Sequence, residues 1–284
     1  MKRKKILFPT DFSVPATNAF QYALQLADKI GADVQVIHAI YPDVEPLDLS
    51  MVITQASRAK IEIGLASMRS FVKTVVEATR SKLEHDPALL TDVLVGTPVQ
   101  TILDASKRES ADMIVMGTRG EQRGIVKWLG SVAADVVKRA EIPVLVVPED
   151  CELREPMHIA YAAEMNSADP FEIWKVMELF ESMDILLRCV HFNQTAELTD
   201  NYEKMEQMKA FFSGRVPTIP IHFHHLPGKQ LTDDLNDFVD KYEMDLLVMY
   251  QPQRGFLEGL FHRSDSKKMA VHTHVPLLVQ KENN

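Results

Sequence analysis

Cysteine is scarce in this sequence. Only Cys151 and Cys189 occur in 284 residues, too few for a disulfide framework. No apolar run approaches the roughly 20 residues that a membrane-spanning helix needs, and no apolar signal segment follows the basic cluster at 2–5. These absences exclude a disulfide-stapled secreted module. They predict a cytoplasmic protein without a membrane partner.

Positive charge is also in short supply. Lys and Arg total 31 against 40 Asp and Glu, which gives a formal net charge of −9 at pH 7. Because a nucleic-acid-binding face normally needs a basic surface, this balance argues against nucleic acid as a partner. Hydrophobic residues at 46% and charged residues at 25% are typical of a globular protein.

Catalytic signatures are missing as well. No nucleophile motif and no paired-carboxylate spacing stands out, and the phosphate-binding pattern G-x4-G-K-[ST] is absent. We therefore predict no catalytic residue and no dedicated enzyme activity.

The segment 112–148 carries the most informative pattern. An apolar run ends at Gly117, Gly120 follows, and Gly130 with Ser131 comes after nine more residues. An amphipathic segment then leads to a second apolar run, so the order predicts strand, glycine-rich loop, helix and strand. Glycine lets the backbone approach a ligand, and the start of a helix directs N–H groups and a positive dipole end at an anion. The segment therefore predicts a pocket for phosphate groups.

The two halves of the sequence repeat one plan. In the first half we expect strands at 4–12, 33–40, 89–96, 112–117 and 143–147, and helices at 14–30, 54–84 and 98–108. The second half repeats this order, with strands expected at 158–165, 184–192, 219–226, 245–250 and 275–280 and a helix at 169–182. Strands that alternate with helices imply a mainly parallel sheet covered on both faces.

A short charged junction at 149–156 separates the two copies. At 284 residues the chain is long enough for two domains of about 140 residues. We therefore predict one domain over 1–150 and a second over 151–284.

The spacing G-x2-G-x9-G-S resembles the nucleotide-binding signature of the universal stress protein family. Two more features of that family stand in register, the opening KKILFPTDFS at 4–13 and the closing IPVLVVP at 142–148. With the internal repeat, nearly the whole chain resembles a tandem two-domain member. The resemblance implies α/β architecture: two tandem five-stranded, mainly parallel open sheets with helices on both faces. Such Rossmann-like folds bind ligands at the carboxyl ends of their strands.

The resemblance also bears on assembly. Family members commonly pair through their last strands, so 144–147 and 276–279 would form an intramolecular pseudo-dimer, and a homodimer is a further option. Pairing makes physical sense because an unpaired apolar edge strand promotes aggregation.

The resemblance places a nucleotide pocket in the first domain. Pro9, Thr10 and Asp11 would form the turn after the first strand, with the acidic side chain facing the adenosine, and Ala39 would offer backbone groups to the adenine. The remaining contacts would come from the fourth strand and the glycine-rich segment: Met116, Gly117, Thr118, Arg119, Gly120, Gly130, Ser131 and Val132. The implied cofactor is ATP, with Mg²⁺ carried by its phosphates.

Several of these residues have a structural interpretation too. Asp11 could cap the next helix, a role for which Ser13 competes. Gly130 and Ser131 could simply allow close helix packing. Arg119 could contact phosphate through its guanidinium fork, or be exposed loop charge.

The second domain departs from the pattern. AAE at 162–164 replaces PTD at 9–11, and YQPQ at 250–253 stands where GTRG at 117–120 stood. Arg263-Ser264 replaces the Gly-Ser pair. These changes add side chains where backbone should meet phosphate, and proline removes an N–H donor. We therefore predict a degenerate domain that does not bind ATP in the usual way.

Histidines concentrate in the second domain. Eight of the ten lie there: 158, 191, 222, 224, 225, 262, 272 and 274. On a strand, His222 and His224 would share one face, with His225 opposite. Two histidines on one face can begin a zinc site, and His191, His272 or His274 could add a third ligand. Exposed or hydrogen-bonded histidines are the interpretation we favour, and we predict no metal ligand.

These observations predict an ATP-binding, cytoplasmic stress-response protein. The first domain would hold the nucleotide, and regulatory protein partners, which the sequence does not identify, would sense its occupancy. The alternatives are a slow ATP hydrolase and a nucleotide-free scaffold or sensor that acts through protein partners.

Overall fold

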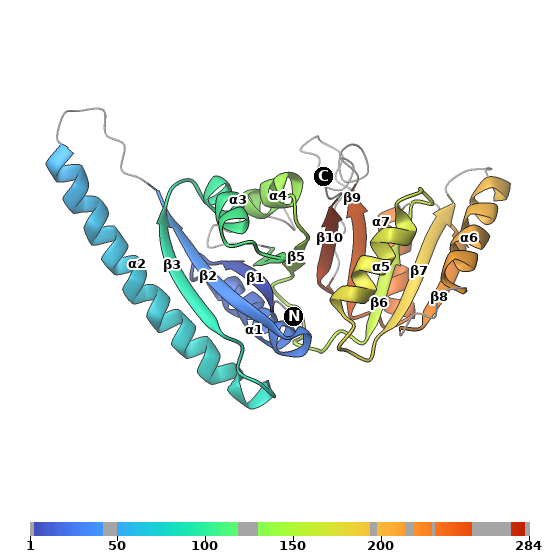
Figure 1. Cartoon of the computed structure of the whole chain (residues 1–284), viewed down its shortest axis with the longest axis horizontal. Helices are drawn as coiled ribbons and strands as arrows, with labels where there is room; N and C mark the ends of the chain where they lie inside the picture. The colour runs from blue at the N-terminus through green and yellow to red at the C-terminus, as the bar shows by residue number, and fades with distance from the viewer. Residues whose placement is uncertain are drawn as a thin grey trace. The chain divides into compact units, whose positions relative to one another are not determined.

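The computed structural model describes residues 3–41, 50–118, 130–193, 198–213, 219–228, 231–251 and 274–281. The chain divides into two compact units, Met1–Glu149 and Asp150–Asn284 (Figure 1). In the described residues no helix is long and apolar enough to cross a membrane.

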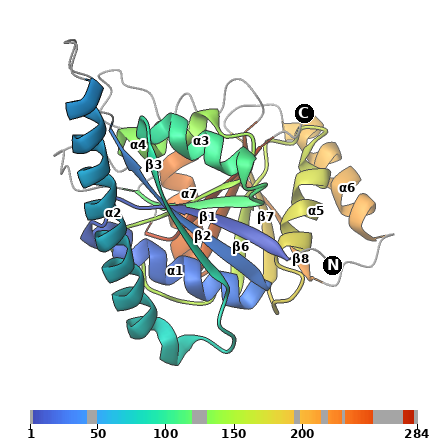
Figure 2. The same cartoon turned by 60° about the vertical axis from the view of Figure 1, so that its left-hand side comes forward.

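The first unit contains five parallel strands and their connecting helices. Its elements are β1 (Lys4–Pro9), α1 (Val14–Ile30), β2 (Ala32–Ile40), α2 (Ser50–Thr79), the 3-10 turn η1 (Arg80–Lys82), β3 (Leu89–Val95), α3 (Pro98–Arg108), β4 (Met113–Gly117), α4 (Ser131–Arg139) and β5 (Val144–Val147). The strand order is β3-β2-β1-β4-β5. Helices α1 and α2 cover one face of the sheet, and α3 and α4 cover the other (Figures 1 and 2). The predicted fold is confirmed.

Local sequence signals explain why α1 has the predicted bounds. The hydroxyl of Ser13 accepts a hydrogen bond from the amide of Ala16, and Pro15 stands in the first turn, where it is tolerated. Gly31 ends the helix with φ at 65°, a left-handed conformation that glycine adopts without steric cost. The apolar face is buried, with Phe20 fully enclosed.

The core of the first unit follows from its central strands. β4 and β5 are buried on both faces, which explains their unbroken apolar runs. The edge strand β3 is instead mostly half-buried or exposed: Val93 is buried, whereas Leu90 and Val95 are exposed. Helix α2 packs closely against β2 and β3 at Gly64. An added Cβ at this glycine would come within 3.1 Å of the side chains of Ile40 and Val93.

The second unit repeats the plan. Its elements are β6 (His158–Ala162), α5 (Asp169–Leu179), β7 (Leu186–Asn193), α6 (Leu198–Ser213), β8 (Ile221–Pro227), α7 (Leu231–Lys241), β9 (Leu246–Gln251) and β10 (Leu277–Lys281). The strand order is β10-β9-β6-β7-β8, again parallel. Helix α6 contacts β7 through Met208 and Cys189, whereas α7 packs on the opposite face through Phe238 and Phe192.

Several details differ from the sequence-based expectations. Strands β1 and β6 each end three residues earlier than predicted, at Pro9 and Ala162, and α2 spans Ser50–Thr79 instead of 54–84. Helix α5 ends at Leu179 rather than 182, because a turn begins at Phe180, whose carbonyl accepts from the Met183 amide, and both side chains are buried. Helices α6 and α7 were not among the predicted elements. The pairing of the last strands concerns how the two units sit relative to each other, and it stays a prediction.

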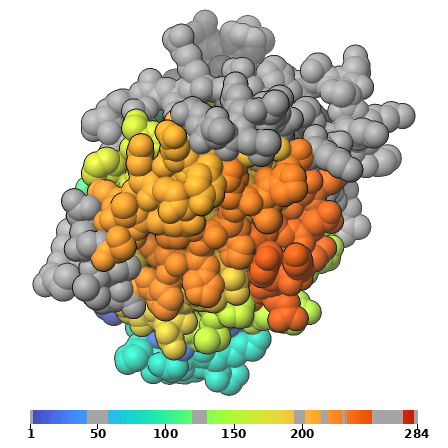
Figure 3. Space-filling view, turned by 90° about the vertical axis from the view of Figure 1, so that its right-hand side faces the viewer, coloured from blue at the N-terminus to red at the C-terminus, as the bar shows by residue number. Residues whose placement is uncertain are grey.

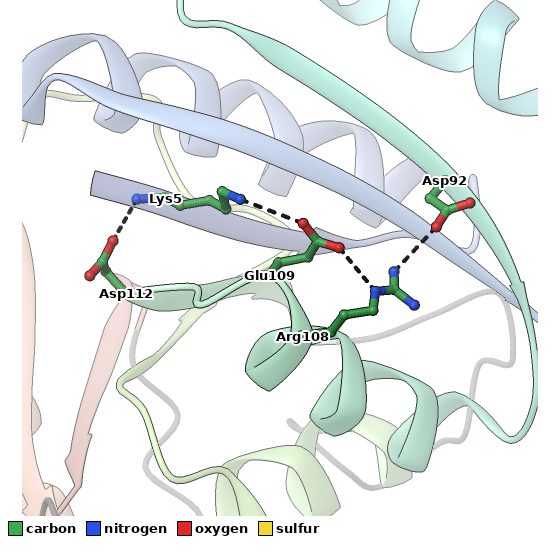
Figure 4. A network of polar contacts seen from close by, with 5 residues as sticks. All are labelled: Lys5, Asp92, Arg108, Glu109 and Asp112. Atoms are coloured by element: carbon green, nitrogen blue, oxygen red, sulfur yellow. Dashed lines mark hydrogen bonds and ion pairs between the residues drawn. The ribbon is translucent and has the colours of Figure 1, made fainter. Parts of the chain in front are cut away.

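A network of charges joins the start of β1, the end of α3 and the middle of β3 (Figure 4). The Asp112 carboxylate accepts from the Lys5 amide at 2.7 Å, and Lys5 Nζ lies 3.5 Å from Glu109 Oε2. Arg108 donates to Glu109 at 3.0 Å and to Asp92 at 3.2 Å. The hydrogen bond from Arg108 holds the pKa of Glu109 below its ordinary value. Every cation in this network therefore has a carboxylate partner.

Candidate ligand site at the carboxyl edge of the first sheet

The turn after β1 is tied to β2 through Thr10. Its amide donates to the carbonyl of Ile37 at 2.9 Å, and His38 Nδ1 lies 2.8 Å from the Thr10 carbonyl oxygen. Because a carbonyl oxygen only accepts, Nδ1 carries the proton in this contact. The Thr10 hydroxyl in turn accepts from the amide of Phe12 at 3.0 Å. These bonds fix the turn in one conformation.

Phe12 adopts a backbone conformation that is unusual for a residue with a side chain. Its φ is 64°, in the left-handed region. Its ring lies 4.3 Å from the His38 ring and 5.6 Å from the Phe71 ring, measured between centroids. These contacts offset the backbone strain, which is of order 1–2 kcal/mol.

The two interpretations of Asp11 are now separable. Ser13 is the residue that caps α1, whereas the Asp11 carboxylate accepts from the Ser13 amide at 3.1 Å. Asp11 is exposed at the end of the strand. Its carboxylate therefore supports the turn and still faces the open edge of the sheet.

A second group of predicted residues gathers where β4 meets α4. The amide of Thr118 donates to the carbonyl of Val147 at 3.0 Å, and the carbonyl of Thr118 accepts from the amide of Gly130 at 2.6 Å. Thr118 is buried, so this junction is enclosed. The bond brings the two ends of the glycine-rich segment together.

The start of α4 offers amide donors. Its first intrahelical bond runs from the Ala134 amide to the Gly130 carbonyl at 2.9 Å, so the amides of Ser131, Val132 and Ala133 precede it. Ser131 is exposed, and Gly130 has φ −62° and ψ 157° as the N-cap. This helix start can attract an anion through its amides and its dipole.

Sheet topology places both groups at one edge. β2, β1 and β4 are neighbours and parallel, so Ala39, Pro9 and Gly117 all lie at the carboxyl end of the sheet. The Met116 side chain is buried, which leaves its backbone as the part that can face a ligand. Arg119 and Gly120 lie outside the described residues.

His38 was missed as a positioning residue. The signal that could have found it is its repetition, since His191 holds the same place in the second unit. His191 Nδ1 lies 2.8 Å from the carbonyl oxygen of Ala163, and the Ala163 amide donates to Val190 at 2.9 Å. The two units thus share one device for fixing the turn after their first strand.

The turn of the second unit is stabilised differently. Ala163 has no hydroxyl, and a fully buried Asp169 contributes instead, accepting from the Asn166 amide at 3.0 Å and from the Tyr161 hydroxyl at 2.9 Å. Burial raises the pKa of Asp169, and burial together with the charge of Asp169 raises the pKa of Glu164. The predicted difference at 162–164 therefore changes the interior behind the turn as well as its surface.

The phosphate end of the second unit is described only in part. Tyr250 and Gln251 close β9 as ordinary strand residues. Residues 252–273, which include the replaced Arg263-Ser264 pair, lie outside the described part of the chain.

The histidines of β7 and β8 divide between two faces. Arg188 Nη1 lies 3.3 Å from His222 Nδ1 and 3.4 Å from His224 Nε2, and both nitrogens act as acceptors because a guanidinium only donates. His225 lies on the other face, its ring centroid 5.6 Å from that of His191. His191 therefore does not join His222 and His224 in a metal site.

The remaining histidine candidates are His262, His272 and His274. His274 lies 3.5 Å from the Asp240 carboxylate, and His262 and His272 fall outside the described residues. Within the described ranges, no group of three or more His, Cys, Asp or Glu side chains could hold a metal ion.

Comparison with known proteins settles the family. The sequence model of the universal stress protein family matches residues 2–148. The chain belongs to the universal stress protein family. Universal stress protein MJ0531 of Methanocaldococcus jannaschii is 34% identical over 147 residues, covering 51% of this chain and 81% of that protein. Universal stress protein Rv2005c of Mycobacterium tuberculosis is 23% identical over 242 residues, covering 76% of this chain and 77% of its own.

A solved universal stress protein from Archaeoglobus fulgidus DSM 4304 has the same fold over both units. It matches 98% of this chain and 96% of its own length, with a TM-score of 0.67 and 18% sequence identity. At that identity the likeness concerns the fold alone.

Proposed function

We propose that the first unit binds ATP, with Mg²⁺ carried by the phosphates, and that the protein is a cytoplasmic nucleotide-dependent member of the stress response. The observation that carries this proposal is the bond between Gly130 and Thr118. It sets the start of α4 at the carboxyl edge of the sheet, where β1 also presents Asp11.

The phosphate end of the ligand would meet α4. The amides of Ser131 and Val132 precede the first helical bond, and the exposed Ser131 hydroxyl adds a donor. A negative charge at such a helix start gains about 0.3–1 kcal/mol from the dipole at an exposed position. Gly130 carries no side chain, so phosphate oxygens can approach the backbone there.

The nucleoside end would meet β1 and β2. A carboxylate at the end of a strand can accept hydrogen bonds from ribose hydroxyls, as in other open α/β nucleotide folds. Asp11 is exposed at that place, and the bonds among Thr10, His38 and Phe12 hold it in position. Ala39 would present its backbone to the adenine.

The second unit would act as a partner rather than as a second ATP site. Tyr250 and Gln251 end β9 where the first unit has glycine and threonine. Asp169 also places a carboxylate behind the turn that would face the nucleoside. We expect regulatory protein partners to respond to occupancy of the first unit.

The test is to purify the protein without added nucleotide, denature it, and identify the released ligand by mass spectrometry. We expect one ATP per chain, and none from Gly130→Val. The φ of Gly130 suits a residue with a side chain, so this variant should fold and lose binding through the blocked approach of phosphate. Asp135→Val, at an exposed position one turn further along α4, is the control for added bulk.

Each outcome has a defined meaning. Unchanged ATP stoichiometry in Gly130→Val refutes the phosphate site, and two ATP per chain refutes the degenerate second unit. Released ADP or AMP, together with turnover that depends on Gly130, would identify a slow hydrolase. No release and no binding of Mg-ATP at millimolar concentration would identify a nucleotide-free scaffold.

A further inference from the structure

A cluster of cationic and aromatic side chains lies at the amino end of β7 and β8 in the second unit. It consists of Arg188 on β7, His222 and His224 on β8, Lys241 at the end of α7, and Tyr242 after it. We call these five residues the Arg188 cluster. Figure 3 faces this side of the second unit, where β8 and α7, both orange, adjoin the more golden α6.

The contacts within the Arg188 cluster leave donors on the guanidinium unused. Nη1 is shared between His222 and His224, and both distances, 3.3 and 3.4 Å, are long for a charge-assisted bond. Nε is buried, and no hydrogen-bond partner for it is found in the described part of the chain. The guanidinium carbon lies 4.9 Å from the centroid of the Tyr242 ring.

The cluster holds positive charge without an acid. Lys241 Nζ lies 5.3 Å from the centroid of the same Tyr242 ring, so two cations lie close to one aromatic ring. In the described ranges no carboxylate lies within ion-pair distance of Arg188. Burial, followed by the charges of Arg188, His222 and Lys241, lowers the pKa of His224. All the charges that act on His224 are thus of one sign.

Comparison with the first unit shows which carboxylates the Arg188 cluster lacks. The strand registers show which residues of the two units correspond. Ile37 and Val190 hold equivalent places, because the carbonyl of each accepts from the turn after the first strand of its unit. Asp92 on β3 pairs with Ile37, and His224 on β8 pairs with Val190. His224 therefore stands in the place of Asp92, whose carboxylate accepts from Arg108 (Figure 4).

The helix ends correspond in the same way. Lys241 ends the eleven-residue α7 as Arg108 ends the eleven-residue α3, so Tyr242 replaces Glu109. The second unit has therefore kept the cation at the helix end and lost both carboxylates, and Arg188 adds a further cation where the first unit has Gln35.

We propose that the Arg188 cluster binds a small phosphate-type oxyanion, either inorganic phosphate or the phosphate group of a phosphomonoester. The guanidinium fork matches phosphate oxygens, and the ligand would supply the negative charge that Asp92 and Glu109 supply in the first unit. His224 would take up a proton and change from an acceptor of Arg188 to a donor toward the anion, with His222 beside it on the same face of β8.

Proton uptake gives the site a distinct pH dependence. Protonated histidines favour binding as the pH falls, whereas phosphate loses part of its charge below its second pKa of about 6. Affinity should therefore rise as the pH falls from 8 toward the second pKa of phosphate, about 6, and should not keep rising below it.

The experiment is a titration of the full chain with inorganic phosphate at pH 6.5. NMR signals of the ring protons of His222 and His224 are recorded at each phosphate concentration. We expect saturable shifts of both signals at millimolar phosphate. Acetate at matched ionic strength, which should give no saturation, controls for screening. Titration with glycerol phosphate then distinguishes free phosphate from a phosphomonoester as the better ligand.

Three variants sharpen the test. Arg188→Gln introduces the residue that Gln35 holds in the first unit, and His224→Asp restores the carboxylate of Asp92. Each should weaken phosphate binding by at least about tenfold. Arg108→Gln removes a cation that already has carboxylate partners, and it should leave binding at the Arg188 cluster unchanged.

Phosphate binding at the Arg188 cluster is independent of ATP binding by the first unit. The Gly130→Val variant should therefore show the same NMR shifts of His222 and His224 on phosphate titration. A thermal unfolding scan confirms that each variant is folded. Absence of saturable shifts at pH 6.5, or undiminished affinity in a folded Arg188→Gln, would overturn the proposal.

Discussion

The pair formed by Tyr161 and Asp169 allows a sharp test of how the second unit is stabilised. Both side chains are fully buried, and the hydroxyl donates to the carboxylate at 2.9 Å. In the first unit the corresponding positions hold Phe8 and Ala16, which are also buried and need no such bond. The double substitution Tyr161→Phe, Asp169→Ala therefore gives the second unit the same two side chains that the first unit has at these positions.

The magnitudes follow from the groups left without partners. Asp169→Ala orphans the Tyr161 hydroxyl and the Asn166 amide, each at about 1–3 kcal/mol, so it should destabilise the second unit by about 2–6 kcal/mol. Tyr161→Phe removes one hydrogen bond to a carboxylate and should cost about 1.5–3 kcal/mol. The double variant leaves no orphaned hydroxyl, so its cost should fall short of the sum by about 1–3 kcal/mol.

Tryptophan fluorescence can follow the second unit by itself. The chain has two tryptophans, and Trp174 lies in α5, the helix that begins at Asp169. Urea unfolding in a Trp128→Phe background would report on this unit, with a separate probe for the first because two units need not unfold together. Additive single costs, to within about 0.5 kcal/mol, would show that the pair does not couple and would refute the reasoning.

The same pair predicts a pH dependence with a defined sign. Because burial raises the pKa of Asp169 above 3.8, the folded state holds its proton more tightly than the unfolded state. The contribution to stability is complete below pH 3.8 and is lost as the pH rises through the raised pKa. The advantage of wild type over Asp169→Ala should therefore shrink as the pH increases above 4, about the ordinary pKa of an aspartate.

Three further predictions concern the first unit, and urea denaturation checks the stability of each variant. Ser13→Ala should destabilise it by about 1 kcal/mol, whereas Asp11→Ala should weaken ATP binding with less effect on stability, because only Ser13 caps α1. Gly31→Ala should cost about 1 kcal/mol from its positive φ alone, since nothing lies within 4 Å of an added Cβ. Gly96→Ala should cost more, because its Cβ would fall 2.5 Å from a threonine hydroxyl. Glu109→Gln should cost less than about 1 kcal/mol, as expected for a partly exposed ion pair. Because Arg108 lowers the pKa of Glu109, that stabilisation is lost as the pH falls below 4.5 toward the lowered pKa, and the variant should lack this dependence.

These predictions fail in recognisable ways. Equal losses of stability in Ser13→Ala and Asp11→Ala would show that the cap is shared. A smaller cost for Gly96→Ala than for Gly31→Ala would show that the loop before α3 relaxes freely. If Glu109→Gln lost as much stability at acid pH as the wild type does, the acid sensitivity would originate from other groups.

Periodic and punctuated segments of the sequence were predictable. Helix α1 has the predicted bounds because Ser13 and Gly31 mark both ends and its apolar face has helical spacing. The α4 start at Ser131 followed from the Gly-Ser pair. Helices α6 and α7 escaped prediction, although α7 carries an acidic first turn that a search for helix starts could have used.

Side-chain partnerships were harder to predict. The repetition of His38 as His191 is visible in the sequence, but the bond of His38 to Thr10 is not, because it exists only where β1 and β2 pair in parallel register. The alternation of β8 correctly separated His225 from His222 and His224, but the arginine between the latter two comes from the neighbouring strand.

The sequence by itself determined the family, the α/β class and the duplicated plan, because apolar periodicity, glycine spacing and helix caps are local properties. Only the tertiary structure decided which side chains meet. It joined Thr118 to Gly130, gave Ser13 rather than Asp11 the capping role, and gathered Arg188 with two histidines and, among the residues that the structure describes, no paired acid. Such contacts depend on strand order and register, which bring together residues that are far apart in the chain.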